Sequence, residues 1–257
     1  MRKKSLLFTL AAAVGLTAGP ALAADIPVKA PVYNVPPPAS VSTWTGCYIG
    51  GNLGGGWNHK HFDFPFGGGL FDEGTLNQGG FVGGGQLGCD YQFGSSFVVG
   101  VQGMFDGTTI KGTETFFSGI DLINERYAVD LHWFGTLTGR VGFLATPSLL
   151  LYGKGGVAWV NEKIDYVPGQ EVVASTGNTT RSGWDVGAGI EWMFAPQWTA
   201  FVEYNHMDFG TKDKNLYFVA DGSFDFTERV KQSVDMVVVG VNWRFYSTTP
   251  GVGSSRY

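Results

Sequence analysis

The chain has 257 residues, of which 15% are aromatic, only 15% are charged and 40 are glycine, a balance unusual for a soluble globular protein. Its formal net charge is -5, and without the three basic residues near its start 14 basic side chains stand against 22 acidic ones, giving -8. This negative balance argues against a nucleic-acid partner.

The N-terminus has the pattern of a secretory signal peptide. Arg2, Lys3 and Lys4 precede an apolar stretch that starts at Leu6, and the small residues around Ala23 form a cleavage site. An N-terminal transmembrane helix is the alternative, but glycines and a proline interrupt the apolar run and no stop-transfer charge follows it. We therefore predict a signal peptide over 1–23 and export of the remaining chain.

The exported chain divides into three parts. Residues 24–43 hold five prolines and little that could form a core, so we expect an extended, proline-rich periplasmic leader. Residues 44–246 suffice for one sizeable domain, and residues 247–257 form a C-terminal tail. No exported segment approaches the roughly 18–20 unbroken apolar residues of a membrane helix, so a closed β-barrel is the remaining way for it to span a membrane.

Apolar and polar residues alternate along eight segments of the domain. In HWFGTLTGRVGFL, Trp133, Leu137 and Val141 share one parity, while Thr138 and Arg140 share the other. This alternation is typical of strands that face lipid on one side and a polar lumen on the other. The predicted strands cover residues 44–58, 80–93, 96–105, 132–144, 149–160, 183–194, 198–207 and 234–245, with 96–105 the least clear.

The connections favour a membrane barrel over a soluble β-sandwich, which could also alternate. Three short connections, such as ATPS, alternate strictly with four of about 20 residues. We therefore predict an all-β fold, an eight-stranded antiparallel transmembrane β-barrel of up-and-down topology with short periplasmic turns and long extracellular loops. The loops exposed outside the cell would lie near residues 59–79, 107–126, 161–180 and 210–232.

Glycine-rich stretches such as WTGCYIGGNLGGGWN suit a narrow barrel. An eight-stranded lumen has room for only modest side chains, so glycines relieve crowding and permit strong curvature. These glycines lie inside predicted strands rather than between a strand and a helix, which argues against a phosphate-binding loop.

Several segments resemble a known family, among them WTGCYIGGNLGGGW, GGFVGGGQLGCDYQF, HWFGTLTGRVGF, GWDVGAGIEW and the closing VGVNWRF. Over nearly all of residues 44–246 the chain is similar to the alphaproteobacterial outer-membrane immunogenic proteins, small porin-like barrels similar to the transmembrane domain of outer membrane protein A. The resemblance implies an abundant surface antigen in the outer membrane of a Gram-negative bacterium, which supports envelope integrity and has no established catalytic residues. The leader ADIPVKAP also fits, whereas Cys47, Cys89 and the tail depart from the pattern.

A barrel of this kind is expected to meet several partners. We expect outer-membrane lipid and lipopolysaccharide, the barrel assembly machinery, and host surfaces or peptidoglycan as further partners. Phe245 ends the last predicted strand as an outward aromatic beside Trp243, which suits a terminal residue used in assembly and in the interfacial girdle.

Signals for catalysis or metal binding are weak. His59 and His61 could hold a metal loosely, but two histidines without a nearby acidic or thiolate set fall short of a closed site. His206 near Glu203 and Asp208 could be a base with its carboxylate, yet the strand pattern places no serine or cysteine nucleophile beside it. We therefore expect no enzymatic activity, no metal and no cofactor.

Charged residues at lumen positions bear on function. They are Arg140, Lys154, Glu191, Glu203 and Arg244, and in a narrow barrel they should pair across the axis. One hypothesis is a structural and surface-interaction barrel whose lumen is plugged by polar side chains. The alternative, on the same fold, is a narrow porin for small hydrophilic solutes.

The two cysteines, Cys47 and Cys89, share the outward side of neighbouring predicted strands. If these strands pair symmetrically about the glycine run 67–69, residues whose numbers add to 136 lie opposite one another, and the two cysteines face each other. The periplasm is oxidising, and directly opposed residues about 4.5 Å apart at Cα lie at the short end of disulfide geometry. We predict a disulfide, with two free thiols acting as small apolar residues as the alternative.

Overall fold

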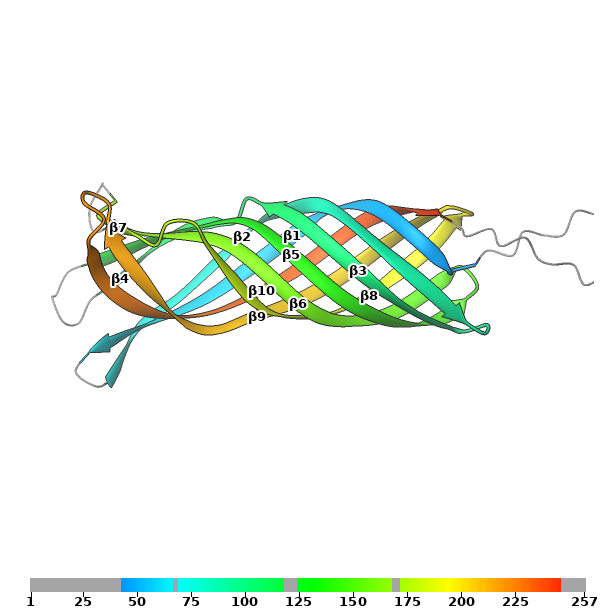
Figure 1. The fold of residues 1–257 in the computed structure, drawn as a ribbon, viewed down its shortest axis with the longest axis horizontal. Coiled ribbons are helices and arrows are strands. Elements are labelled where there is room, and N and C mark those ends of the chain that lie inside the picture. The colour runs from blue at the N-terminus through cyan, green and yellow to red at the C-terminus, as the bar shows by residue number, and fades with distance from the viewer. Residues whose placement is uncertain (1–42, 67–68, 118–123, 168–171, 246–257) are drawn as a thin grey trace, which may run out of the picture. The chain divides into compact units, whose positions relative to one another are not determined.

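The computed structural model describes residues 43–66, 69–117, 124–167 and 172–245. The predicted signal peptide, nearly all of the predicted leader and the predicted tail lie outside these ranges. Figure 1 shows long, tilted strands that run side by side. The strands are β1 (Gly46–Phe66), β2 (Gly69–Phe93), β3 (Phe97–Thr108), β4 (Lys111–Phe117), β5 (Asn124–Thr146), β6 (Leu149–Tyr166), β7 (Ala174–Ser175), β8 (Thr179–Ala195), β9 (Trp198–Phe218) and β10 (Phe224–Phe245). In the described ranges no helix is long and apolar enough to cross a membrane.

The strands form one closed antiparallel sheet. β1 pairs with β2 on one side and with β10 on the other, so the first and last wall strands meet. β3 and β4 pair with successive parts of β5 and together make one wall strand. β7 is a two-residue strand between β6 and β9. The wall therefore has eight strands, in the order β1, β2, β3 with β4, β5, β6, β8, β9 and β10, which confirms the predicted barrel.

The strands extend further on the loop side than predicted. β1 and β2 remain paired as far as Phe66 and Gly69, inside the predicted loop near residues 59–79. The other three predicted loops likewise contain strand residues. The inward parity continues there, since Lys60 and Phe62 are buried. The loop side of the barrel thus has walls and an interior of its own.

Outward side chains are apolar and exposed, as predicted. Leu137, Val141, Ile190, Val202 and Val239 expose 44–63% of their surface, whereas their neighbours of the other parity are largely buried. Two aromatic belts border this apolar band. The lower belt, near the short turns, includes Phe97, Phe143, Trp198, Trp243 and Phe245, and the upper belt includes Trp57, Phe105, Trp133, Trp184 and Tyr204.

The belts define the membrane-spanning part of the wall. On β5, the stretch from Trp133 to Phe143 matches the about 9–11 residues that a tilted strand needs to cross a bilayer. Residues between the belts face lipid on one side and the lumen on the other. Residues beyond the upper belt lie outside the membrane.

Inward glycines make room for side chains that cross the lumen. Tyr48 lies over Gly88 and Phe201 lies over Gly240, with ring atoms 2.6 Å from where a Cβ would be. A larger residue at either glycine would force the ring or the wall to move. The glycine content therefore reflects a tightly filled interior.

Candidate functional site in the barrel lumen

Four alternating charges form a ring around the lumen near the lower belt. Asp90 on β2, Arg140 on β5, Glu191 on β8 and Arg244 on β10 come from every second wall strand. Arg140 lies 2.5 Å from Asp90 and 2.9 Å from Glu191, and Arg244 lies 2.6 Å from Asp90 and 3.2 Å from Glu191. All four side chains are at most 1% exposed. Two cations balance two anions, so this charge ring compensates itself.

Aromatic groups support the two arginines of the charge ring. The centroid of the Tyr48 ring lies 4.8 Å from the guanidinium carbon of Arg140 and 5.2 Å from that of Arg244. Arg244 also donates to the backbone carbonyl of Trp44 at 2.7 Å. The Trp44 indole donates to the carbonyl of Pro147, in the turn between β5 and β6, at 3.0 Å. Because Trp44 is fully buried, it covers the charge ring on the side of the short turns.

Lys154 and Glu203 form a second ionic group further along the lumen. Lys154 Nζ lies 2.7 Å from one oxygen of Glu203, and the Tyr152 hydroxyl donates to the other at 2.7 Å. Asp106 and Asp185, absent from the predicted set, are also buried, and Asp185 is 3.8 Å from Lys154. Among the described residues, neither oxygen of Asp185 has a hydrogen-bond partner. This part of the lumen carries more negative than positive charge.

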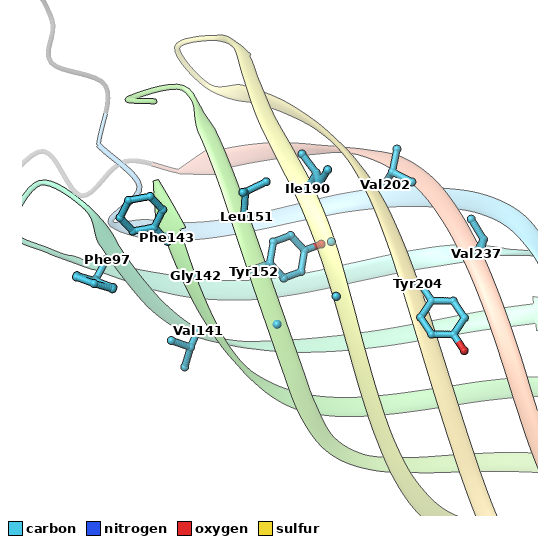
Figure 2. A pocket seen from close by; sticks show the side chains of 13 residues that line it. Phe97, Val141, Gly142, Phe143, Leu151, Tyr152, Ile190, Val202, Tyr204 and Val237 are labelled. Atoms are coloured by element: carbon cyan, nitrogen blue, oxygen red, sulfur yellow. The ribbon is translucent and has the colours of Figure 1, made fainter. Parts of the chain in front are cut away.

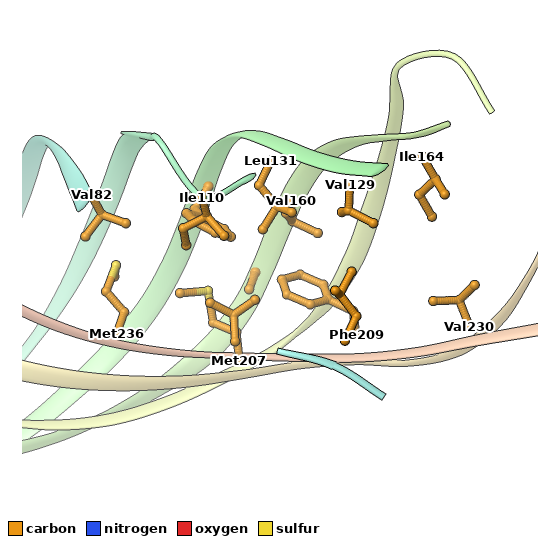
Figure 3. Packing of buried hydrophobic residues seen from close by; sticks show 14 of the residues in the cluster. Val82, Ile110, Val129, Leu131, Val160, Ile164, Met207, Phe209, Val230 and Met236 are labelled. Carbon is orange, nitrogen blue, oxygen red and sulfur yellow. The ribbon is translucent and has the colours of Figure 1, made fainter. Parts of the chain in front are cut away.

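An apolar layer crosses the lumen beyond these ionic groups, in addition to the predicted polar side chains. Figure 3 shows Val82, Ile110, Met207 and Met236 pointing into the barrel from different parts of the wall. Each is at most 4% exposed. Parity alone separates inward from outward positions, but it does not require the inward ones to be polar. Packing these side chains removes apolar surface from water and fills the lumen.

A third ionic group lies beyond the upper belt, and we call it the outer charge cluster. It consists of Lys60 on β1, Glu162 on β6, Arg181 on β8 and Lys214 on β9. Lys60 Nζ lies 2.5 Å from Glu162 Oε2, while Lys214 Nζ and Arg181 Nη1 lie 3.5 and 3.7 Å from Glu162 Oε1. Because β1 and β6 are opposite in the eight-stranded wall, the Lys60–Glu162 pair crosses the whole lumen.

Burial and neighbouring charges shift the pKa values in the outer charge cluster. Burial lowers the pKa of Lys60, Arg181 and Lys214, and attraction to Glu162 offsets only part of this. Burial by itself would raise the pKa of Glu162, but the three cations hold it below its usual value. Glu162 is therefore a carboxylate at neutral pH.

The histidines do not form the catalytic or metal arrangements considered above. Glu203 faces the lumen, whereas His206 is on the outer face with Nδ1 2.8 Å from Asp235 Oδ1, so the wall separates the two. His59 and His61 lie on the outer side of β1 rather than in a loop. In the part of the chain that the structure describes, no group of three or more His, Cys, Asp or Glu is placed to hold a metal ion.

A shallow apolar hollow lies on the outer wall (Figure 2). Val141, Leu151, Ile190 and Val202 line it from four neighbouring strands, and its lining contains no charged side chain. These four side chains are exposed on the lipid-facing side. The hollow therefore offers contact to acyl chains and no catalytic group.

Cys47 and Cys89 face each other across β1 and β2 on the outer side of the wall. The register in which paired numbers add to 136 holds from Gly46 to Phe62, where a bulge shifts it. The structure joins the two sulfurs in a disulfide, with the Cα atoms 3.9 Å apart. Phe245 pairs with Cys47 from β10 and packs edge-on against Trp243, with ring centroids 4.3 Å apart.

Comparison with known proteins places this barrel in a family. The family model of the outer membrane protein beta-barrel domain matches residues 9–245. The chain belongs to this family. It is 33% identical over 248 residues to the 31 kDa outer-membrane immunogenic protein of Brucella melitensis, covering 92% of this chain and 98% of that relative. It is 28% identical over 192 residues to the 22 kDa outer membrane protein of Rhizobium leguminosarum bv. viciae, covering 73% and 74%. The predicted family and outer-membrane location are confirmed.

Among solved structures, the outer membrane protease OmpT of Escherichia coli is similar with a TM-score of 0.49 and 9% identity, covering 78% of this chain and 97% of OmpT. This similarity is too weak for protease activity to be inferred for the present chain.

All five predicted lumen residues of this outer-membrane barrel are buried inside it, and the structure joins them in two groups. Asp90 was missed, although it shares the lumen parity and supplies the second anion of the charge ring. The outer charge cluster was missed because its residues fall in predicted loops or next to them. Continued alternation from Asn58 through Lys60 to Phe62 is the signal that would have revealed it.

Proposed function

We propose that this chain is a structural barrel of the outer membrane with a lumen that does not conduct ions, and that its loop side is a surface antigen. The charge ring carries the proposal. Its four side chains contact one another around the lumen and are covered by Trp44 on the side of the short turns. Ions would have to break these contacts to pass.

The apolar layer adds a second barrier in series. Val82, Ile110, Met207 and Met236 are packed where a water column would have to run. Apolar constrictions close pores because water leaves them. Opening the charge ring alone would therefore leave the pathway blocked.

The outer-membrane location and the relatives support the proposed partners and surface role. The names of the relatives describe immunogenic outer-membrane proteins, and we extend this surface role to the present chain. The outer wall would contact outer-membrane lipid and lipopolysaccharide, and Phe245 at the end of β10 would engage the barrel assembly machinery. Host surfaces and peptidoglycan are further proposed partners, and we propose no enzymatic activity.

A narrow porin is the second candidate, and the middle of the lumen favours it. Both oxygens of Asp185 and one of Asp106 have no hydrogen-bond partner within the described residues. Buried carboxylates of this kind are usually hydrated. Water molecules bound at these groups would form the first part of a hydrated path for ions through the lumen.

Planar-bilayer recording on the refolded full chain tests the choice between the two. We expect no steady single-channel current from the wild-type protein. Insertion is checked in parallel by the protection of the barrel from protease in vesicles of the same lipid. A steady open state in protein that has passed this check would replace the plugged barrel with the porin.

A further inference from the structure

The outer charge cluster has more positive charge than its own side chains neutralise. Lys60, Arg181 and Lys214 surround the single carboxylate of Glu162, and all four side chains are at most 11% exposed. The formal surplus is two positive charges. The charge ring, by contrast, has no formal surplus, because its two arginines are balanced by two carboxylates. A buried surplus of this kind is unfavourable unless another anion compensates it.

Donors in the cluster are left without acceptors. Arg181 Nη2 donates to the carbonyls of Gly210 and Val230 at 2.9 and 3.1 Å, which fixes the guanidinium in place. Arg181 Nε is buried and, over the described residues, has no hydrogen-bond partner, while Nη1 is in an ion pair with Glu162 Oε1 at 3.7 Å. Lys214 Nζ donates to Thr179 Oγ1 at 2.7 Å and, as an ammonium, has further donors. Fixed, unused donors next to surplus positive charge are what an anion site requires.

The further charged neighbours whose side chains are described do not cancel the surplus. Asp208 attracts Arg181, and Lys212 repels Lys214. Among the side chains that the structure describes, counting these two with the cluster leaves the same excess of two positive charges. Burial lowers the pKa of Lys60 and Lys214, and repulsion from the neighbouring cations lowers both further.

Location and size define the ligand. Lys60 is three residues beyond Trp57 of the upper belt and Arg181 is three residues beyond Trp184, so the cluster lies outside the membrane. The side chain of Lys214 is 11% exposed, which provides contact with solvent. Phe62 and Ile164, the next inward residues after Lys60 and Glu162, are buried and apolar and limit the space. These apolar neighbours favour a small ligand.

We propose that the outer charge cluster binds a small inorganic anion of about the size of chloride, held by Arg181 and Lys214 on the loop side of the barrel. The ion compensates the buried cations and tethers β8 to β9. The site is independent of whether the lumen conducts.

Bromide serves as the probe, and thermal unfolding of the refolded full chain in detergent micelles is the measurement. At constant ionic strength, the unfolding midpoint should rise more in sodium bromide than in sodium methanesulfonate, whose anion is bulkier. Arg181→Met should abolish this difference. Lys111→Met is the matched control, because Lys111 is 65% exposed and outside the cluster, and it should keep the difference.

Two further variants and a crystallographic measurement keep the proposal testable if Arg181→Met does not fold. Lys214→Gln, at the partly exposed edge, should weaken the bromide effect, and Glu162→Gln should reach half of the effect at a several-fold lower bromide concentration. Crystals soaked in bromide should show an anomalous peak beside Arg181 and Lys214. Equal midpoints in bromide and methanesulfonate, or equal losses in Lys214→Gln and Lys111→Met, would overturn the site.

Discussion

Arg140 holds both carboxylate oxygens of Asp90, with Nε 2.7 Å from Oδ1 and Nη2 2.5 Å from Oδ2. The contact joins β5 to β2 across the inner face of β3. The third guanidinium nitrogen of Arg140, Nη1, donates to Glu191 Oε2 at 2.9 Å. A planar guanidinium can satisfy two carboxylates in this way, whereas a lysine ammonium lacks the fork. Arg140 is therefore the residue that the charge ring can least easily replace.

Removing Arg140 should strongly destabilise the barrel. Arg140→Met leaves Asp90 and Glu191 buried with Arg244 as the one remaining cation of the charge ring, and uncompensated buried charges of this kind cost about 3–5 kcal/mol. The free energy of unfolding in urea, measured in lipid vesicles, should fall by this amount. Lys111→Met breaks an exposed ion pair with Asp130 and should change the free energy of unfolding by less than about 1 kcal/mol. Equal effects of the two variants would show that the charge ring contributes nothing to stability.

Two neighbouring glycines should respond oppositely to the same substitution. An alanine at Gly54 would place its Cβ in the lumen, overlapping the carbonyl of Val237 and 2.8 Å from the Cα of Val238. At Gly55 the nearest atom to a Cβ, on the Trp57 ring, is 3.8 Å away, so the methyl group fits on the lipid side. Gly54→Ala should cost about 1–3 kcal/mol or more, whereas Gly55→Ala should be neutral or slightly stabilising. Urea unfolding checks both, and a harmless Gly54→Ala would contradict the crowded lumen.

Strand parity explains why most of the barrel could be predicted from the sequence. Residues that face lipid must be apolar, so residues such as Leu137 and Val239 show which side of each strand faces lipid, without any knowledge of the tertiary structure. The ends of the strands could not be found this way. Beyond the upper belt the outer face of the wall contacts water, so outward residues there need not be apolar. His59 and His61 point outward and Lys60 and Phe62 point inward, so polarity no longer separates the two faces.

Partners across the lumen were beyond the reach of the sequence. Asp90, Arg140 and Glu191 are about 50 residues apart in the chain, and their contact depends on the tilt and stagger of strands that are not neighbours. Parity gives the side of the wall on which a residue lies but not its height along the lumen. The Cys47–Cys89 register could be derived because it depends on a single pair of adjacent strands.

An arginine on the outer face should disturb membrane insertion. Val239 is 44% exposed toward lipid, between the belts, and Val239→Arg should cost about 2–4 kcal/mol if it lies near the midplane. Thr138 faces the lumen, and Thr138→Ser keeps its hydroxyl, so it serves as the control. Refolding yield into bilayers should fall for the first variant only. Equal yields would contradict the assignment of the lipid-facing side.

Protease added to intact cells should cut on the loop side. Residues 219–223 connect β9 to β10 beyond the upper belt and are exposed. Residues 147–148 connect β5 to β6 beside the lower belt and should be protected until the outer membrane is opened. Mass spectrometry of the fragments locates the cut. Cleavage confined to Pro147 or Ser148 in intact cells would invert the proposed orientation.

The Cys47–Cys89 disulfide should be present in protein taken from the native envelope. The two cysteines are directly opposed, with Cα atoms 3.9 Å apart, and the periplasm through which the chain passes is oxidising. Thiol titration under denaturing, non-reducing conditions should find no free thiols, and titration after reduction should find two.

The same bond should stabilise the barrel, because it joins residues separated by 42 positions and thereby restricts the unfolded chain. Reduction should lower the free energy of unfolding by about 2–4 kcal/mol. The double variant Cys47→Ser with Cys89→Ser is the control, since reductant should leave its stability unchanged. Two titratable thiols in the untreated native protein would reject the bridge and leave the cysteines as small apolar residues facing lipid.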